Sequence, residues 1–370
     1  MKKRYIEKQI KNDLARKMVF LAGPRQVGKT TLAKKILPDK RGYLSWDITG
    51  HRNMILKNEL PPVNFFVFDE IHKYKRWRNF LKDVYDNIGD KSKILVTGSA
   101  KLNQYRYGGD SLQGRYHFLR MYPLTVAELG ISNQKELFEL LTLGGFPEPY
   151  FSSSKKEAKR WSREYRTLLI NEEVDSLEHI LDLGTLELLS IRLPDLVGSP
   201  LSINSLREDL QTSHKTISNW LNIFERLYAI FRLKPFGSPL LRAVKKEQKH
   251  YHFDWTFIPD EAIKFENLVA LHLLKWVYYL QDTEGKEIDL CYFRDIDGRE
   301  VDFVITEDRK PILFIEVKWQ DREVSKSLKY LHNKYKDTKA LQISAIGTKD
   351  YLTKEGIRVL PALQFLKKLS

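Results

Sequence analysis

The residues best suited to chemistry lie in a glycine-rich segment near the start of the chain. Residues 23–30 read GPRQVGKT and match the pattern GxxxxGK[ST] at every fixed position. They follow an apolar run, Met18–Ala22, that predicts a buried strand, and they precede a helix expected over Thr30–Ile36. In such a loop the backbone N–H groups surround a phosphate, and the helix N-terminus adds partial positive charge. The pattern predicts a nucleotide-binding loop; the alternative is a glycine turn that binds nothing.

Each part of this loop has an expected contact. Lys29 would reach the β- and γ-phosphates, and the Thr30 hydroxyl would bind Mg²⁺. We therefore expect ATP and Mg²⁺ as cofactors. The expected nucleotide-binding residues are Gly23, Pro24, Arg25, Gln26, Val27, Gly28, Lys29, Thr30 and Thr31, together with Ser99 further along the chain.

Two acidic residues stand at the end of a second apolar run. Asp69 and Glu70 close the segment FFVFDE, which predicts a buried strand over Asn64–Asp69. We expect Asp69 to hold Mg²⁺ and Glu70, on the other side of the pleat, to polarise the water that attacks the γ-phosphate. This pair favours an ATPase over a kinase. The alternative is a strand that ends in two solvated carboxylates.

Hydroxyl groups follow a third apolar run, Lys93–Thr97. Thr97 and Ser99 stand where a group that senses the γ-phosphate would lie. Because the carboxyl ends of parallel strands meet at one edge of a sheet, these hydroxyls belong beside the loop and the acidic pair. Either one could instead cap the turn after the strand.

A second set of residues that could do chemistry lies towards the C-terminus. Residues 299–305 alternate polar and apolar, and a second strand is expected over Ile312–Trp319. With a period of two, Glu316 and Lys318 share one face of that second strand. A hairpin would bring Asp302 beside them.

Two carboxylates and a lysine are the set that binds Mg²⁺ and orients a water for in-line attack on a phosphodiester. We expect Asp302, Glu316 and Lys318 to be catalytic here. Glu266, on the preceding long helix expected over Glu261–Tyr279, could complete the metal shell. The expected metal ligands are thus Glu266, Asp302 and Glu316 here and Thr30 and Asp69 in the first set. The alternative is a charged pair on an ordinary edge strand.

A helix–turn–helix pattern lies between the two sets. Residues 202–210 predict a capped amphipathic helix, 213–221 predict a second, and a third apolar-faced helix is expected to end at Leu227, before a β wing over Ala229–Leu233. In winged-helix proteins the second helix of this motif lies in the major groove of DNA. The residues expected near DNA are Lys215, Thr216, Ser218 and Asn219. The same module also occurs in proteins that bind only protein.

Length and composition limit what kind of protein can carry these residues. The chain has 370 residues, a formal charge of +14 and 42% hydrophobic residues, which excludes a disordered chain and suggests two or three domains. No apolar run is long enough to span a bilayer or to form a signal-peptide core. A single cysteine, Cys291, fits a reducing cytoplasm. The basic surplus points to a polyanionic partner, unless it reflects a basic proteome or a hot habitat.

The order of the first three motifs resembles that of the AAA+ ATPases. The resemblance covers about residues 18–125 and implies a parallel α/β sheet with ATP bound at its edge. The polar sensor of that superfamily is commonly Asn, so Thr97 and Ser99 depart from its pattern. AAA+ proteins also use an arginine near the segment GRYHFLRMYPLT in trans, which would require an oligomer. Arg115 is the first candidate for this arginine finger and Arg120 the second, although either could be a surface charge.

The C-terminal set resembles the PD-(D/E)xK restriction-endonuclease-like fold, with Val301 in place of the proline. The whole chain resembles a family of archaeal and bacterial AAA-type ATP-binding proteins with a C-terminal domain of unknown function. The matching stretches are GPRQVGKTT, FFVFDEIH, ILVTGSA, LGGFPE, FDW, FENLVA, EVDFVI and IEVKW. This resemblance implies architecture and ATP binding but no substrate.

These observations predict an α/β protein with four domains. We expect a P-loop AAA+ ATPase core with a parallel sheet, a helical lid, a winged helix–turn–helix and a mixed α/β nuclease-like domain. A basic run over Arg242–Lys249 marks a linker. The expected bounds are 1–125, 126–200, 201–240 and 241–370.

Three functions remain open at this stage. In the first, the protein is a cytoplasmic ATPase, not bound to membrane, whose nucleotide state controls its C-terminal half. That half faces nucleic acid, with DNA favoured over RNA, and cleaves it with Mg²⁺. In the second, a degenerate nuclease-like domain makes the protein a nucleotide-gated switch that binds nucleic acid or protein without cleavage. The third, a structural protein without catalysis, fits poorly with an intact phosphate loop.

Overall fold

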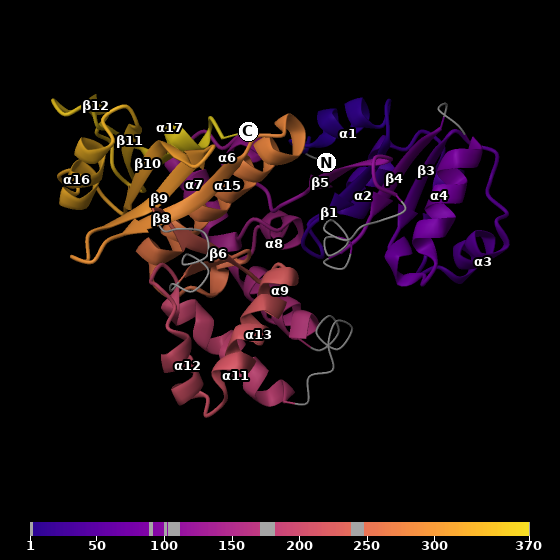
Figure 1. Ribbon diagram of the computed structural model, residues 1–370, viewed down its shortest axis with the longest axis horizontal. Helices are drawn as coiled ribbons and strands as arrows, with labels where there is room; N and C mark the ends of the chain where they lie inside the picture. Colours follow the sequence, from indigo (N-terminus) through magenta and orange to yellow (C-terminus); the bar gives the residue numbers. More distant parts are fainter. Residues whose placement is uncertain are drawn as a thin grey trace. The chain divides into compact units, whose positions relative to one another are not determined.

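Two units make up the chain, Met1–Pro123 and Leu124–Ser370, and each is built around its own sheet (Figure 1). The computed structural model describes residues 3–88, 92–99, 102, 112–170, 182–237 and 248–369. Among the helices described, none is both long enough and apolar enough to cross a membrane.

The first unit holds a five-stranded parallel sheet with the strand order β2-β3-β4-β1-β5. Its strands are β1 (Met18–Ala22), β2 (Tyr43–Ser45), β3 (Phe65–Asp69), β4 (Lys93–Thr97) and β5 (Tyr116–Arg120). All five residues of β1 are buried, which is typical of a central parallel strand covered on both faces. The predicted parallel α/β sheet is therefore confirmed.

Helices cover both faces of this sheet. They are α1 (Glu7–Asp13), α2 (Lys29–Ile36), α3 (Thr49–Lys57) and α4 (Trp77–Ile88), with single 3₁₀ turns η1 (Lys40–Gly42) and η2 (Ile71–Lys73). Phe66 and Phe68 point to the face that packs against Phe80 and Leu81 of α4. Residues on the opposite pleat, Asp69 included, therefore face α2. β2, α3 and β5 were not expected from the sequence.

The second unit begins with helices and continues into a mixed sheet. Its helices are α6 (Val126–Leu129), α7 (Gln134–Leu143), α8 (Pro147–Ser152), α9 (Lys155–Leu168), α11 (Leu183–Arg192), α12 (Ile203–Asp209), α13 (His214–Arg226), α15 (Glu261–Glu284), α16 (Lys326–Lys334) and α17 (Ala362–Leu366), with 3₁₀ turns η5 (Leu193–Leu196) and η6 (Trp255–Phe257).

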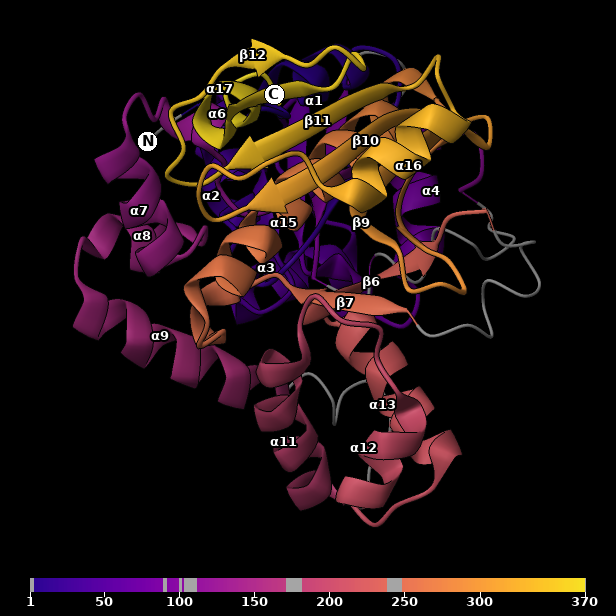
Figure 2. The same cartoon turned by 90° about the vertical axis from the view of Figure 1, so that its left-hand side faces the viewer.

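The second sheet has eight strands in the order β12-β13-β11-β10-β9-β8-β6-β7. Their bounds are β6 (Ile230–Pro235), β7 (Lys249–His252), β8 (Ile288–Arg294), β9 (Glu300–Glu307), β10 (Lys310–Lys318), β11 (Lys339–Ser344), β12 (Tyr351–Leu352) and β13 (Arg358–Pro361). Helix α15 lies along one face and α16 along the other, as Figures 1 and 2 show. The apolar positions of α16, Leu328 and Leu331, are fully buried against the sheet.

The described residues of the segment predicted to be helical over 126–200 are mostly helical, and they pack within the second unit. The indole Nε1 of Trp255 donates to the carbonyl of Leu141 at 3.0 Å, and the hydroxyl oxygens of Ser162 and Thr256 lie 2.7 Å apart. These contacts join α7 and α9 to the turn η6. That this segment acts as a lid over a nucleotide stays a prediction.

The helix–turn–helix differs from the prediction in two respects. The expected second and third helices are one continuous helix, α13, because no glycine or proline interrupts the residues between Leu221 and Leu227. The strand expected as a separate wing is β6, which pairs antiparallel with β7 and, near its end, parallel with β8. It is thus a strand of the large sheet. Figure 2 shows α11, α12 and α13 beyond this edge of the sheet.

The basic run expected to be a linker falls partly outside the described residues, which omit 238–247. Its last residue, Lys249, is not part of a solvated connection. It opens strand β7 and is 0% exposed.

Candidate functional site

The phosphate loop connects β1 to α2, as the sequence predicted. Two of its glycines are required by the backbone. Gly28 has a φ of +98° immediately before α2, and Gly23 has a φ of +148° with the space for a Cβ already occupied by the carbonyl oxygen of Met121. Residues that have a Cβ rarely adopt these backbone conformations, so the loop depends on glycine at both positions.

Lys29 is buried within this loop. Its Nζ donates to the carbonyl oxygens of Gly23 at 2.9 Å and Pro24 at 2.6 Å. The ammonium group is therefore held over the concave side of the loop by two neutral acceptors. Phosphate oxygens are stronger acceptors for an ammonium than carbonyls are, so a bound phosphate can take over these bonds.

Asp69 is the centre of a hydrogen-bond network at the end of β3. Its Oδ2 accepts from Thr30 Oγ1 at 3.0 Å and from the Tyr43 hydroxyl at 2.6 Å, and its Oδ1 accepts from Thr97 Oγ1 at 2.5 Å. The structure thus brings together the two predicted metal ligands, Thr30 and Asp69. Oxygen donors of this kind suit Mg²⁺.

Tyr43 was not predicted as part of this site. It lies on β2, a strand of three residues that is too short for its pattern to be recognised. Burial and the neighbouring Asp69 raise the pKa of its hydroxyl, which therefore stays a hydrogen-bond donor. Ser99 is buried just beyond β4, where its carbonyl accepts from Leu102 N at 3.1 Å.

Glu70 lies close to this network, but not for the reason given by the sequence. It is outside β3, with a left-handed backbone (φ +55°), so the expected alternation of the pleat does not apply to it. Its N–H donates to Thr97 O at 2.9 Å. Burial raises the pKa of Glu70, and Lys29 is the strongest opposing influence. The carboxylate is therefore near the loop lysine and more basic than an exposed glutamate.

The two candidate arginine fingers have different surroundings. Arg115 precedes β5 and is partly exposed, with its Nε 3.1 Å from Asp86 Oδ1. Arg120 ends β5 opposite Ala22 of β1 and is only 6% exposed. Arg115 is therefore the more exposed of the two, whereas Arg120 is part of the interior of its own unit.

A further arginine supports the loop and was not singled out from the sequence. Arg4 is 3% exposed and donates from one guanidinium nitrogen to Val27 O at 2.9 Å and from the other to Tyr122 O. It therefore connects the segment before α1 to the phosphate loop. A basic residue at the start of an amphipathic helix gives no signal of such a contact.

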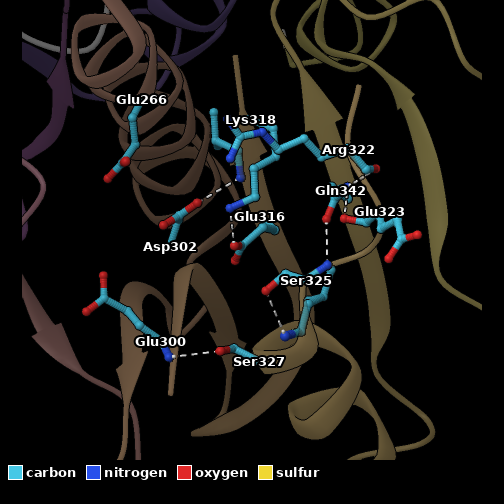
Figure 3. A network of polar contacts seen from close by, with 12 residues as sticks. Glu266, Glu300, Asp302, Glu316, Lys318, Arg322, Glu323, Ser325, Ser327 and Gln342 are labelled. Carbon is cyan, nitrogen blue, oxygen red and sulfur yellow. Dashed lines mark hydrogen bonds and ion pairs between the residues drawn. The ribbon is translucent and has the colours of Figure 1, made fainter. Parts of the chain in front are cut away.

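The second predicted set comes together on the large sheet. β9 and β10 are antiparallel neighbours, with Phe303 opposite Ile315. Asp302 Oδ2 accepts from Val317 N at 2.8 Å, and Lys318 Nζ lies 2.6 Å from Glu316 Oε1. Figure 3 shows Asp302, Glu316 and Lys318 side by side, with Glu266 reaching towards them from helix α15. The predicted hairpin is confirmed.

Lys249 enters this cluster from β7. Its Nζ lies 2.5 Å from Glu300 Oε1, 3.9 Å from Glu266 Oε1 and 4.0 Å from Asp302 Oδ1. The ammonium is thus surrounded by three carboxylates. The sequence gives no signal of this contact, because the four residues of β7, KHYH, show no alternation of polar and apolar residues.

Burial changes the acidity of the whole cluster. It raises the pKa of Glu266 to about 8 and that of Glu316 to about 7, and in both cases the nearby Asp302 adds to the effect. The pKa of Asp302 is raised by burial as well. Burial alone would lower the pKa of Lys249, but the surrounding carboxylates raise it. The lysine stays charged, while Glu266 and Glu316, with pKa values of about 8 and about 7, exchange protons near neutral pH.

The structure does not show Glu266, Asp302 and Glu316 together as the three-carboxylate metal site expected from the sequence. No group of three or more His, Cys, Asp or Glu side chains in the described ranges is arranged to hold one metal ion. Glu316 Oε2 is buried without a hydrogen-bond partner among those residues. Such an acceptor fits Mg²⁺, which is commonly bound through one or two carboxylates plus water and substrate phosphate.

The polar face of α13 points away from the core. Ser213 Oγ caps the helix by accepting from Thr216 N at 3.0 Å, and Lys215 and Asn219 are exposed. Ile217, Trp220 and Leu221 form the buried face. Of the four residues expected near DNA, Thr216 and Ser218 are half-buried.

Three protein-family models match successive parts of this chain. Residues 15–130 match the family described as an AAA domain, and residues 134–258 and 263–365 match two domains of unknown function, DUF8612 and DUF4143. An uncharacterized protein of Mycobacterium tuberculosis is 22% identical over 297 residues, or 74% of this chain and 67% of that protein. One of Methanocaldococcus jannaschii is 24% identical over 306 residues, or 67% of this chain and 62% of its own.

The chain therefore spans about two thirds of the length of these relatives. Among solved structures, a signal transduction ATPase with numerous domains from Pyrococcus horikoshii, which carries a tetratricopeptide repeat sensor, is 14% identical. The alignment covers 74% of this chain and 47% of that one, with a TM-score of 0.23. The matched family and the site geometry agree for the first unit: residues 15–130 form a P-loop ATPase domain of the AAA type.

Proposed function

We propose that this protein binds and hydrolyses ATP with Mg²⁺, and that its nucleotide state controls a second unit that faces DNA and cleaves it. The observation that carries the ATPase proposal is the convergence of Thr30, Tyr43 and Thr97 on Asp69. Two neighbouring strands and the loop helix each donate a hydrogen bond to this one carboxylate. Such a network fixes the carboxylate where a metal ion beside the phosphates needs it.

In the first unit the loop N–H groups and Lys29 would bind the β- and γ-phosphates. Thr30 and Asp69 would hold Mg²⁺, which supplies positive charge to the phosphate oxygens. Glu70 would accept a proton from the attacking water as its oxygen bonds to the γ-phosphorus. The bond to the bridging oxygen then breaks, and ADP and phosphate are released. The raised pKa of Glu70 makes it a better base for this step than an exposed glutamate.

The finger proposal requires a second copy of the chain. Arg115 would leave Asp86 and donate to the γ-phosphate bound by a neighbouring protomer. In P-loop enzymes such an arginine contributes about 10³–10⁵-fold in rate. A homo-oligomer that forms on ATP binding would support this role.

In the second unit, Asp302 and Glu316 would hold Mg²⁺, which supplies positive charge to a scissile phosphodiester. Lys318 would orient the attacking water from its position beside Glu316. Glu266 is the third predicted ligand. Lys215 and Asn219, exposed on α13, would contact DNA in the manner of a winged-helix reader. The buried acceptor Glu316 Oε2 supports the metal proposal.

A second candidate function follows from Lys249. A buried ammonium already neutralises part of the acidic cluster, which would suit a degenerate site that binds nucleic acid or protein without cleaving it. In that case the protein is a nucleotide-gated switch. Cleavage assays separate the two candidates.

The proposal is tested by phosphate release from ATP and by DNA binding in the same preparations. We expect Mg²⁺-dependent hydrolysis that Thr30→Val reduces strongly. We also expect the affinity for labelled DNA to differ between the ATP and ADP states and to fall steeply with salt. Equal affinity in both nucleotide states would reject nucleotide control, and affinity that does not change with salt would indicate a protein partner.

A further inference from the structure

We infer that Lys249 takes the position of a second metal ion in the acidic cluster, so that the site holds one divalent cation, between Asp302 and Glu316, and Glu266 is not a ligand. This inference rests on the proposed metal-dependent cleavage. It changes the ligand set expected from the sequence and assigns a role to Lys249 and Glu300.

The position of the ammonium carries the inference. Lys249 Nζ is within 4.0 Å of oxygens from Glu266, Glu300 and Asp302. A Mg²⁺ ion bound to both Glu266 and Asp302 would lie about 2.1 Å from each oxygen. It would have to share that space with a positive charge already there. Coulomb repulsion at such a distance in a buried site is strong, so the lysine and a metal ion exclude each other.

The lysine is also fixed in place. Its side chain is 1% exposed and ion-paired to Glu300. At the other end of its strand, Asn267 of α15 accepts from His252 N and donates to His252 O, each at 2.7 Å. The β7 backbone is therefore clamped to the helix that carries Glu266. Burial of an ammonium group costs free energy, and the nearby carboxylates of Glu266, Glu300 and Asp302 offset this cost.

The other side of Asp302 remains suited to a cation. Glu316 Oε2 is buried and accepts no hydrogen bond from any described residue, and Asp302 lies beside Glu316 (Figure 3). When all groups are ionised, the four carboxylates face two ammonium groups, those of Lys249 and Lys318. Two negative charges are left, which one divalent cation balances.

Because Lys249 is buried, it cannot touch a nucleic acid and acts as a positioning residue. It pairs with Glu300 and neutralises the charge beside Glu266, whose Oε1 accepts from the Tyr251 hydroxyl at 2.7 Å, and it leaves Asp302 to bind the metal. Two-metal phosphodiesterases place their ions about 3.5–4 Å apart. Here a lysine fills the second position, and the catalytic arrangement is that of a one-metal site.

The test counts Mn²⁺ ions per chain by isothermal titration and electron paramagnetic resonance, without nucleotide, in the full-length Thr30→Val variant. Removing that hydroxyl weakens the metal site of the phosphate loop. We expect one Mn²⁺ in this background. Adding Asp302→Asn should weaken binding by at least about tenfold, whereas adding Glu266→Gln should change it by less than about threefold. Adding Lys249→Met should raise the count to two.

Several results would overturn the inference. They are no Mn²⁺ or two Mn²⁺ in the Thr30→Val background, a loss with Glu266→Gln as large as that with Asp302→Asn, and a count that stays at one in a folded Lys249→Met protein. If Lys249→Met does not fold, as its thermal melt will show, the comparison of Glu266→Gln with Asp302→Asn decides. Should the metal counts match while DNA stays intact, the proposed cleavage fails and the one-metal site stands.

Discussion

The hydroxyl of Thr97 donates to Asp69 Oδ1 across neighbouring strands, with 2.5 Å between the two oxygens. The bond connects the end of β4, which carries Thr97, to the end of β3, which carries Asp69. It leaves Asp69 Oδ2 to face Thr30. Thr97 is fully buried, so it acts through Asp69 rather than on solvent. The sequence left two roles open for Thr97, sensing the γ-phosphate or capping the turn after its strand. A hydrogen bond to Asp69 on the neighbouring strand is not a turn cap.

We expect Thr97→Val to weaken Mg²⁺-dependent ATP binding by about tenfold, because Asp69 loses a partner that orients it. Titration of ATP with and without Mg²⁺ measures this change, and Thr348→Val, at an exposed position of the second unit, is the control. A variant with normal Mg²⁺ dependence but slow turnover would instead make Thr97 a sensor of the γ-phosphate.

Lys29→Ala should reduce ATP affinity by about 100-fold, since a buried charged contact to phosphate contributes about 3 kcal/mol. The fold should be retained, because the two carbonyls that accept from its ammonium group, those of Gly23 and Pro24, belong to the same loop. Calorimetry with ATP and a thermal melt check both statements. Unchanged affinity would remove the phosphate-loop assignment.

Glu70→Gln should bind ATP normally and hydrolyse it about 10²–10⁴-fold more slowly, because a general base is lost. In the unmodified protein the base must be ionised and its pKa is raised, so the rate should fall as pH decreases below a midpoint that lies above 4.5. Measuring kcat from pH 5 to 9 checks this dependence. Wild-type turnover in the variant would exclude Glu70 from the mechanism.

Arg4→Met should lower the free energy of unfolding by about 2–3 kcal/mol, because the buried carbonyls of Val27 and Tyr122 would each lose a charged donor. It should also weaken ATP binding, since Val27 belongs to the loop. Urea denaturation measures the stability, with the exposed Lys8→Met as control. Equal stability of the two variants would show that these bonds do not support the loop.

The acidic cluster predicts a pH dependence of stability. The folded pKa of Glu316, about 7, lies above its ordinary value of 4.5, so the folded state binds the extra proton between these pH values. The free energy of unfolding should therefore fall as pH rises through this range, by up to about 1.4 kcal/mol per pH unit from this group. The contribution of Glu316 should level off above pH 7, whereas Glu266, with a folded pKa of about 8, should continue the fall to about pH 8.

Glu316→Gln should remove that part of the slope and be relatively more stable above pH 7. Urea denaturation between pH 4.5 and 8.5 with chelator present provides the measurement. Identical slopes in both proteins would show that Glu316 is not protonated in the folded state near neutral pH.

The parts of the structure predicted from the sequence are those that depend on local patterns. The loop between Met18 and Thr30 and the strand that ends at Asp69 were recognised because motif and hydrophobic run coincide. The pairing of Asp302 with Glu316 followed from strand alternation. In each case the information lies within about fifteen residues of the chain.

The missed residues depend on contacts between distant segments. Lys249 was read as part of a basic linker, because only the folded sheet brings it beside Glu300. Tyr43 reaches the nucleotide site from a strand too short to show a pattern, and Arg4 reaches it from just before an amphipathic helix whose pattern does not indicate this contact. The positive φ of Glu70 could not be inferred either, since a glutamate rarely adopts that conformation.

The central measurement is cleavage of labelled single- and double-stranded DNA with Mg²⁺ or Mn²⁺, with and without ATP. RNA serves as the comparison substrate, and wild type is compared with Glu316→Ala. We predict metal-dependent cleavage of DNA that changes with ATP and is lost in Glu316→Ala. Intact ATP hydrolysis without cleavage under any condition would contradict it and would favour the nucleotide-gated switch.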